Sequence, residues 1–448
     1  MKKYIAATII ILILLSISPV ITVSQSVYAG EPPSLTAKGA ILIELTTGKV
    51  LYGKNPDEKL YPASTTKILT AMLAIELGDL QDTVTVGEEV NMIPWDSSKA
   101  GLLPGERMTL EHLLYGLLLS SGNDAANTIA VYIARKVGGD DLSVSDALAY
   151  FSRLMNARAR QAGALDSNFV NAHGYHDPDH YSTPYDMAMI AREALKLDIF
   201  RKVIATTTMR SAVLENGNPR YWVNTNKLIH QNNKEYYEYA TGVKTGYTGE
   251  AGSCLVASAS KDGMELVSVV MKSASDHQWG ESRGLLEYGF NNFVRVELFK
   301  KGSIAETLPV ENYAADDWGS LAVEITGETM EVVVSKADLA GIERILEWDE
   351  DLVTYDQGSL PRLKAPVKKG QVVGSLKYML NGELLGQSPL AASRDVKAPV
   401  PVDTATPGGI RLINYLVMAA CIISAYMLYR MTIARLRRRR RRYYYFYR

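Results

Sequence analysis

The feature that most constrains this chain is an apolar run near its carboxyl end. Leu412–Ile433 contains a single charged residue, Arg430, and is long enough to cross a bilayer as a helix. An arginine-rich segment, residues 434–448, follows directly. Because basic residues next to a span stay on the cytoplasmic side, we predict one transmembrane helix with the bulk of the chain outside the cell. A nucleic-acid-binding tail is the alternative, but the adjacent span already accounts for the arginines.

The amino terminus has the pattern of an export signal. Lys2 and Lys3 precede an apolar run that extends to about Ser16, and Val27-Tyr28-Ala29 provides small residues for a signal peptidase. We therefore expect residues 1–29 to be a cleaved signal peptide. An uncleaved membrane anchor is the alternative.

The charge of the chain is unevenly distributed. The formal net charge is −1 overall, but residues 30–410 carry 36 basic and 49 acidic residues. A body this acidic argues against a polyanionic partner such as nucleic acid. The second of the two cysteines, Cys421, lies in the predicted span. Cys254 is thus left alone in the body, which excludes a disulfide framework and a cysteine-rich metal site.

The body of the chain combines strand patterns with a long helical stretch. Apolar residues typical of strands occupy 40–44 and 50–52 around a Thr-Thr-Gly turn, and a strand pattern returns at 264–271. Helical periodicity dominates between Ser64 and Leu197. We expect a sheet flanked by helices and a helical subdomain, which together form a first domain over residues 35–291.

The character of the sequence changes near Asn291. Residues 293–395 show repeated strand patterns, and Asn381-Gly382 between two of them is a strong hairpin signal. We predict a separate small β-rich domain here. Residues 397–409 are rich in proline and glycine and are expected to link this domain to the predicted transmembrane helix at 412–433.

A small polar cluster opens an otherwise apolar helix after Pro62. Ser64 and Lys67 stand three residues apart, which places both side chains on one face of a helix. Burial lowers the pKa of a lysine, so that its amine can accept a proton near neutral pH. A hydroxyl beside such an amine is a nucleophile with its base. The same spacing recurs at Ser258 and Lys261, a segment that we interpret as a strand end and turn.

Two further motifs follow along the chain. Ser121 and Asn123 lie in a polar break after the apolar helix 110–119, and Lys244-Thr245-Gly246 precedes Tyr247. The patterns S-x-x-K, S-x-N and K-T-G in this order are shared by penicillin-binding proteins and serine β-lactamases. The glycine lets backbone approach a ligand, while the lysine and threonine offer a cation and a hydroxyl to a carboxylate.

With these motifs the chain resembles the serine D-alanyl-D-alanine carboxypeptidases of the low-molecular-mass penicillin-binding protein type, over about residues 35–395. The resemblance is carried by PASTTKILTA, SSGNDAAN, NAHG with HYSTPYDMA, KTGYT with AGSCLVASA, and LLEYGF. It implies an α/β (α+β) fold: a DD-peptidase/β-lactamase-like domain with an antiparallel sheet and a helical subdomain, followed by a β-rich domain and membrane attachment. It also implies removal of the terminal D-alanine from peptidoglycan stem pentapeptides, covalent binding of β-lactam antibiotics, and neither cofactor nor metal.

The resemblance assigns three catalytic residues. Ser64 is expected to be the acylated nucleophile, with Lys67 as its general base. Ser121 is expected to relay protons together with Lys244. The expected oxyanion hole consists of the backbone N–H groups of Ser64 and Tyr247.

The resemblance also assigns the binding of the substrate. The expected substrate-binding residues are Asn123, Lys244, Thr245, Gly246 and Tyr247. Asn123 would hold the substrate's amide, and Thr245 would contact its terminal carboxylate. Many members of the family carry an arginine shortly after the K-T-G strand that helps to bind this carboxylate. In this chain residues 275–282 contain no arginine, and the first one is Arg283.

Four alternatives compete with this interpretation. The segment from His173 to His180 has residues of zinc-ligand type, but Pro178 interrupts any helical face, and a polar loop is preferred. A Ser-His-Asp triad is unnecessary, since Ser64 already has a lysine. A class A β-lactamase uses a glutamate to activate water, and the chain has none between Glu111 and Glu193. A membrane-bound sensor that only binds would not need a base.

Overall fold

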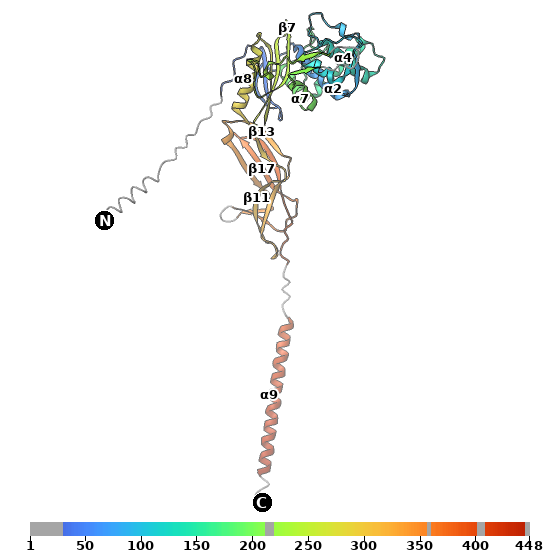
Figure 1. Ribbon diagram of the computed structural model, residues 1–448. Coiled ribbons are helices and arrows are strands. Elements are labelled where there is room, and N and C mark those ends of the chain that lie inside the picture. The colour runs from blue at the N-terminus through green and yellow to red at the C-terminus, as the bar shows by residue number, and fades with distance from the viewer. Residues whose placement is uncertain (1–29, 211–218, 356–359, 401–407, 444–448) are drawn as a thin grey trace, which may run out of the picture. The chain divides into compact units, whose positions relative to one another are not determined.

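The computed structural model describes residues 30–210, 219–355, 360–400 and 408–443 (Figure 1). The predicted signal peptide and residues 444–448 lie outside the described residues. The chain forms two compact units. The first extends to Ser303 and includes Ile325–Glu347 and Ser375–Pro389, and the second contains Ile304–Glu324, Trp348–Gly374 and the chain from Leu390.

The first unit is organised around an antiparallel sheet of five strands in the order β2-β1-β9-β8-β7. The strands are β1 (Gly39–Glu44), β2 (Val50–Lys54), β7 (Ala240–Thr248), β8 (Gly252–Lys261) and β9 (Met264–Ser273). Side chains alternate between the two faces of a strand. Ile41 and Ile43 of β1 therefore join one apolar cluster, while Ala40 and Leu42 join another on the opposite face. Burial of both faces explains why β1 is apolar almost throughout.

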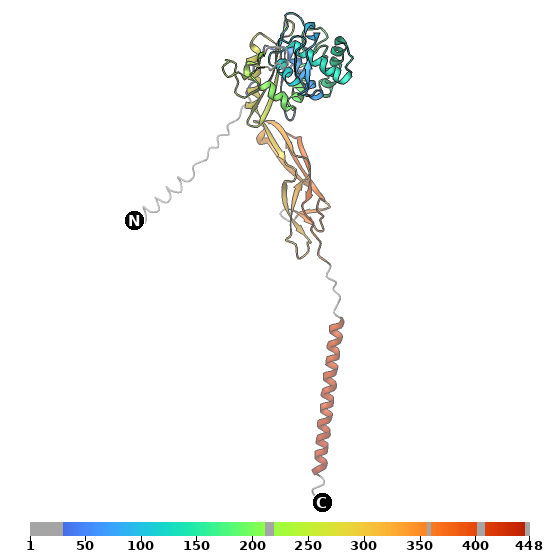
Figure 2. The same ribbon diagram turned by 45° about the vertical axis from the view of Figure 1, so that its right-hand side comes forward.

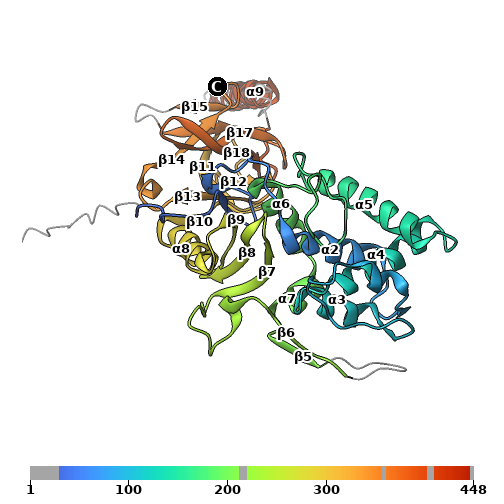
Figure 3. The same cartoon turned by 90° about the horizontal axis from the view of Figure 1, so that it is seen from above.

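Helices cover both faces of this sheet. Helix α8 (His277–Asn292) packs Trp279, Leu285 and Phe290 on one face. The helices on the other side are α2 (Lys67–Leu77), α3 (Leu110–Leu118), α4 (Asn123–Gly138), α5 (Val144–Gln161), α6 (Pro184–Ala194) and α7 (Asp198–Ala205). Figure 3 shows α8 and this helical subdomain on opposite sides of the strands. The predicted sheet with a helical subdomain is confirmed.

Short elements connect the helices of the subdomain. They are η1 (Ala63–Thr66), β3 (Thr83–Thr85), η2 (Glu88–Met92), β4 (Arg107–Thr109), β5 (Thr208–Arg210), β6 (Tyr221–Val223) and η3 (Lys227–Ile229). Strand β3 pairs with β4, and β5 pairs with β6. Two of them, η1 and η3, carry residues that line the cleft described below, Ser64 and Lys227.

Helix α2 is buried on nearly all sides. Its apolar residues Ile68, Leu69 and Met72 have no exposed surface, as the apolar composition of the segment predicts. The helix ends at Gly78, where a Cβ atom would lie 2.3 Å from Cδ2 of Leu110. A side chain at this position would therefore clash with the neighbouring helix α3.

The β-rich part of the chain begins directly after α8. In the first unit β10 (Phe293–Phe299) pairs with β13 (Met330–Ser335), and β14 (Ile342–Trp348), β17 (Val372–Leu380) and β18 (Glu383–Ala392) follow one another in a sheet. Asn381 and Gly382 between β17 and β18 have φ values of 52° and 83°. Positive φ at both residues is typical of a type I′ turn, and the predicted hairpin is confirmed.

In the second unit four strands follow one another in the order β12-β11-β16-β15. These are β12 (Ser320–Ile325), β11 (Ile304–Glu311), β16 (Pro361–Lys364) and β15 (Val353–Tyr355). The pair β11–β16 is parallel, while β11–β12 and β15–β16 are antiparallel. Burial alternates along β12, as expected for a strand with one buried face.

The chain ends in one long helix, α9 (Gly408–Tyr443), which is unbroken in Figures 1 and 2. Ile413–Arg437 within it, a segment of 25 residues, is long and apolar enough to cross a membrane, and none of these residues is buried in the structure. A helix of this length measures about 38 Å, which exceeds the thickness of a bilayer core. The helix is consistent with a membrane anchor.

Candidate active site

The residues of the three motifs meet in one cleft of about 780 Å³ in the first unit. The cleft lies where β7, at the edge of the sheet, faces η1 and the start of α4. Six of the eight predicted site residues line it: Ser64, Ser121, Asn123, Thr245, Gly246 and Tyr247. The other two, Lys67 and Lys244, are buried, with exposed fractions of 0% and 1%.

Ser64 and Lys67 are in direct contact. Ser64 lies in the turn of η1 and is partly exposed, while Lys67 is the first residue of α2. Lys67 Nζ donates hydrogen bonds to Ser64 Oγ at 2.9 Å, to Asn123 Oδ1 at 2.7 Å and to the His173 carbonyl at 2.8 Å. The ammonium thus has three fixed acceptors, and one of them is the hydroxyl that the sequence predicted.

The surroundings of Lys67 favour its neutral form. Burial lowers its pKa well below the usual value, and the charge of Lys244 lowers it further, while Asp124 acts in the opposite direction. Burial alone lowers the pKa of Lys244 to about 7. The buried amines of Lys67 and Lys244 therefore lose their protons at a lower pH than lysines in water.

The turn that presents Ser64 is packed against two glycines. A Cβ atom on Gly246 would lie 3.0 Å from the Pro62 carbonyl oxygen and 3.1 Å from the Ser64 nitrogen. A Cβ atom on Gly174 would lie 1.8 Å from the Ala63 carbonyl oxygen, and Ala63 itself has φ of 47°. Such left-handed backbone is costly outside glycine and is often found at functional sites. Gly246 thus brings the K-T-G strand into contact with the turn that carries Ser64.

Ser121 and Asn123 enter the cleft from the break between α3 and α4. Ser121 has φ of 58°, which turns the chain sharply before Asn123 begins α4. The Asn123 backbone N–H donates to the Ser98 carbonyl at 2.8 Å. Since the side-chain oxygen of Asn123 accepts from Lys67, its amide nitrogen is the end left for a ligand.

Asp124 fixes the loop that forms the neighbouring wall. Its buried carboxylate accepts hydrogen bonds from the backbone N–H groups of Ala100, Gly101 and Leu102 at 2.7 to 2.9 Å. Its place in the first turn of α4 is also where a negative charge is favourable. The adjacent residues Asp96, Ser97 and Ser98 of this loop line the cleft. No motif in the sequence indicated this function of Asp124.

The K-T-G segment supplies the opposite wall. Lys244 Nζ donates to the Thr245 carbonyl at 3.1 Å, and Thr245 Oγ1 lies 2.7 Å from Thr225 Oγ1. Tyr247 is 69% exposed at the rim. The cleft therefore offers hydroxyl groups on this side, with the amine of Lys244 directly behind them.

Two arginines, Arg220 and Arg283, could in principle replace the family's carboxylate-binding arginine, but both lie outside the cleft. Arg220 forms an ion pair of 2.6 Å with the buried Glu106, and Arg283 pairs with Glu287 at 2.8 Å on α8. Neither lines the cleft, whereas Lys227 does. Sequence reasoning missed Lys227 because no spacing rule connects η3 with the three motifs.

The histidine-containing loop supports the site from behind. His180 Nδ1 accepts from the Val170 N–H at 3.2 Å, and its Nε2 lies 2.8 Å from Thr66 Oγ1. Burial lowers the pKa of His180 to about 4 and that of His173 to about 3, so both rings are neutral at pH 7. Within the described residues no three side chains of metal-ligand type gather into a group.

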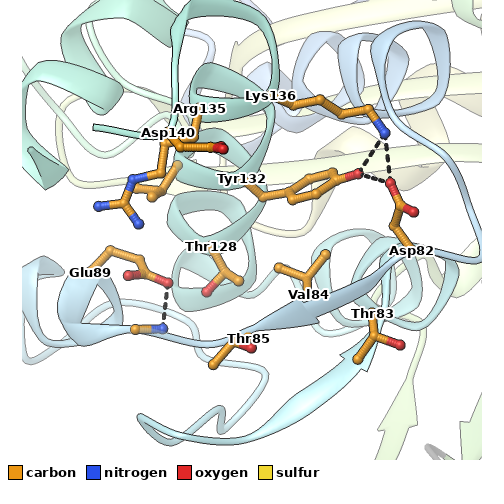
Figure 4. Close-up of a pocket in the computed structure, with 12 residues that line it drawn as sticks. Asp82, Thr83, Val84, Thr85, Glu89, Thr128, Tyr132, Arg135, Lys136 and Asp140 are labelled. Carbon is orange, nitrogen blue, oxygen red and sulfur yellow. Dashed lines mark hydrogen bonds and ion pairs between the residues drawn. The ribbon is translucent and has the colours of Figure 1, made fainter. Parts of the chain in front are cut away.

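A second hollow of about 330 Å³ lies between β3 and α4 (Figure 4). Lys136 Nζ donates to Asp82 Oδ2 at 2.6 Å and to the Tyr132 hydroxyl at 3.1 Å, and Tyr132 also bonds to Asp82. These polar groups satisfy one another, and no residue of the three motifs lines this hollow. The residues with candidate catalytic function line the first cleft and not this hollow.

Fold and site together define a serine-type hydrolase. A reachable hydroxyl next to a buried amine can attack a carbonyl carbon, and backbone N–H groups at the same point can stabilise the resulting oxyanion. Comparison with known proteins gives the family. The family description D-alanyl-D-alanine carboxypeptidase (peptidase S11) matches residues 26–275, and the C-terminal domain of penicillin-binding protein 5 matches residues 293–398.

Individual relatives agree with these matches. The chain is 32% identical to the D-alanyl-D-alanine carboxypeptidase DacF of Bacillus subtilis over 405 residues, which cover 89% of this chain and 95% of that protein. It is 33% identical to DacC of Escherichia coli over 380 residues, 82% and 86% of the two chains. The crystal structure of penicillin binding protein 5 from Haemophilus influenzae has a TM-score of 0.61 at 28% identity, and covers 82% of this chain and 99% of that one.

The chain therefore belongs to the peptidase S11 family and is a serine-type D-alanyl-D-alanine carboxypeptidase with a penicillin-binding protein 5 C-terminal domain. The family, fold and activity expected from the sequence are confirmed. Membership implies a peptidoglycan peptide as substrate and penicillin as a ligand.

Proposed function

We propose that the enzyme releases the terminal D-alanine of peptidoglycan stem pentapeptides through an acyl-enzyme on Ser64. The observation that carries this proposal is the contact of 2.9 Å between Ser64 Oγ and Nζ of the fully buried Lys67. In its neutral form the amine accepts the Ser64 proton while Oγ attacks the carbonyl carbon of the scissile bond.

The negative charge that develops on the carbonyl oxygen needs donors at the same place. The backbone N–H groups of Ser64 and Tyr247 are the proposed oxyanion hole. The tight contact between Gly246 and the Ser64 nitrogen supports this, because it brings the two backbone segments together. The amide nitrogen of Asn123 holds the peptide backbone of the substrate.

The leaving amine requires a proton when the peptide bond breaks. Ser121 and Lys244 form the proposed relay that passes to this amine the proton that Lys67 took from Ser64. Lys67 thereby becomes neutral again, and D-alanine departs. Water then attacks the ester on Ser64, with Lys67 again accepting a proton. This route needs no glutamate, in agreement with the absence of glutamate between Glu111 and Glu193.

The arrangement of the chain relative to the membrane is part of the proposal. Residues 1–29 act as a cleaved signal peptide, residues 35–291 as the catalytic domain and residues 293–395 as the β-rich domain. The linker 397–409 leads to one span at 412–433, with the tail 434–448 in the cytoplasm. Basic residues after the apolar helix support this orientation, with the catalytic domain outside the cell.

The test uses benzylpenicillin and intact-protein mass spectrometry. The wild-type chain is expected to gain the mass of the opened drug, and Ser64→Ala is expected to gain none. Ser258→Ala is the matched control, since Ser258 belongs to the other Ser-x-x-Lys segment, and it should be labelled like the wild type. Labelling of Ser64→Ala would show that another residue is the nucleophile.

A further inference from the structure

The charges around the cleft are unevenly distributed. Within the described part of the chain, the acidic residues that line it are Asp96, Glu250 and Asp276, and Lys227 is the single lysine or arginine among the lining residues. Lys67 and Lys244 lie behind the wall and are already engaged by fixed acceptors. A carboxypeptidase acts only at a free chain end, so its cleft must bind a carboxylate among these acidic groups.

The segment that carries Lys227 is held firmly next to the K-T-G strand. Asn226 caps η3 by accepting from the Leu228 N–H at 3.1 Å, and its own N–H donates to Asn224 Oδ1 at 2.9 Å. Thr225, two residues before Lys227, lies 2.7 Å from Thr245 through their hydroxyl groups. The lysine therefore projects from a fixed backbone beside the threonine expected to contact the carboxylate.

The partners of Lys227 are ones that a ligand can replace. Its Nζ lies 3.2 Å from Asp276 Oδ1 and 5.3 Å from the centre of the Trp279 ring. The two charged side chains are 41% and 73% exposed. Exposed ion pairs of this kind contribute little to stability, so an incoming carboxylate can take the place of Asp276 at small cost.

We propose that Lys227 binds the terminal carboxylate of the substrate and supplies the cation that the missing arginine would have given. Asp276 and Trp279 hold the ammonium at the cleft until a peptide arrives. This inference rests on the proposed function, because it assumes that the scissile bond lies at Ser64. A lysine is a point charge without the fork of a guanidinium, so Thr245 completes the binding with a directed hydrogen bond.

The test compares two substrates that differ only at the chain end. One is a blocked peptide that ends in D-Ala-D-Ala, and the other is the same peptide with a carboxy-terminal amide. Lys227→Gln is expected to lower kcat/KM for the free acid by about 10- to 100-fold, the range for losing one charge-assisted hydrogen bond. For the amidated peptide, kcat/KM of Lys227→Gln should stay within about 2-fold of the wild-type value, because this substrate has no carboxylate for Lys227 to bind.

Two further variants complete the test. Lys227→Arg keeps the charge and should retain most of the preference for the free acid. Lys234→Gln is the matched control, because Lys234 lies in the same region, is 85% exposed, pairs with Glu235 and does not line the cleft. It should behave as the wild type with both peptides.

Several outcomes would overturn the inference. Equal losses of Lys227→Gln on both peptides would mean that the side chain shapes the cleft, and no loss on either would mean that another group binds the carboxylate. Failure of the proposed function would give a different result. In that case Ser64→Ala would still hydrolyse the free-acid peptide, whatever the Lys227 variants do.

Discussion

Ser64 with Lys67 and Ser258 with Lys261 have the same spacing but lie in different secondary structure. The first pair lies where η1 passes into α2, and its two polar atoms are 2.9 Å apart. The second pair lies in the extended strand β8, where residues three apart point to opposite faces. A spacing of three therefore makes a chemical pair only on a helical turn.

The two pairs also differ in their surroundings. Lys67 has no exposed surface, and burial lowers its pKa. Lys261 is partly exposed and lies 4.7 Å above the ring of Tyr239, while Ser258 Oγ is 2.7 Å from Thr241 Oγ1. The second serine and lysine thus have separate structural partners. Secondary structure and burial, more than residue identity, distinguish the proposed reactive pair, Ser64 and Lys67, from the pair Ser258 and Lys261.

The largest expected difference between the pairs is in acylation. Lys67→Ala removes the base, so the rate of penicillin acylation should fall by about 10²- to 10⁴-fold, the usual contribution of a general base. Lys261→Ala should leave this rate nearly unchanged. Stopped-flow measurement with a fluorescent penicillin gives both values. If penicillin acylated Lys261→Ala more slowly than Lys67→Ala, Lys67 would not be the base.

The second prediction concerns the backbone around the reactive pair. A Cβ atom on Gly246 would lie within 3.1 Å of the Ser64 nitrogen, whereas one on Gly249 would have no atom within 4 Å. Gly246→Ala should therefore displace the turn of η1 and lower kcat/KM by roughly 10- to 100-fold, since small misplacements near the reacting atoms have such effects. Gly249→Ala is the matched control and should stay close to the wild type. Similar activities of the two variants would show that the turn tolerates this displacement.

The third prediction concerns the titration of His180, whose ring contacts Thr66 next to Lys67 and, among the described residues, has no counterpart beside the second pair. The pKa of His180 is lowered to about 4, mainly by burial, while an unfolded histidine has a value of about 6.5. The unfolded chain therefore binds more protons between these values, so stability is present above pH 6.5 and is lost as the pH falls. The expected loss between pH 7 and pH 5 is about 2 kcal/mol from this residue.

Denaturant unfolding of the chain without helix α9, measured at pH 7 and at pH 5, gives this loss. In His180→Gln the contribution of the ring is removed, so the dependence on pH should become flatter. An unchanged slope in this variant would assign the acid sensitivity to other groups.

Much of the candidate active site could be predicted from the sequence, because three short motifs indicate residues that meet in one cleft. The Ser-x-x-Lys spacing alone is a weak signal, since it recurs at Ser258 and Lys261. The three motifs together, in the order S-x-x-K, S-x-N and K-T-G, indicate the chemistry. The supporting contacts could not be predicted in this way. The His173 carbonyl that accepts from Lys67 and the loop bound by Asp124 depend on residues brought together only by tertiary packing.

In the fold, too, some features follow from local sequence patterns and others depend on tertiary packing. Strands β1 and β9 and the turn at Asn381-Gly382 follow from local patterns, since alternation and turn residues act within a few positions. The position of Lys227 does not. It depends on how η3 packs against β7 and on Asp276, which is 49 residues away along the chain. Local rules contain no information about such a contact.

The smallest expected effect tests whether Lys261 has a structural function. Its ammonium lies over the Tyr239 ring, and a cation above an aromatic ring at a partly exposed site contributes about 0.5 to 1 kcal/mol. Lys261→Met keeps much of the side-chain volume and removes the charge, so the free energy of unfolding should fall by about this amount while acylation by penicillin stays unchanged. Tyr239→Leu should lower stability more, because the ring also packs against Tyr237 and Phe290. In the Tyr239→Leu background the change at Lys261 should then have almost no further effect, because the two residues act through one contact. If the two losses were additive, Lys261 would stabilise the fold through some other contact, and its separation from the reactive pair would rest on geometry alone.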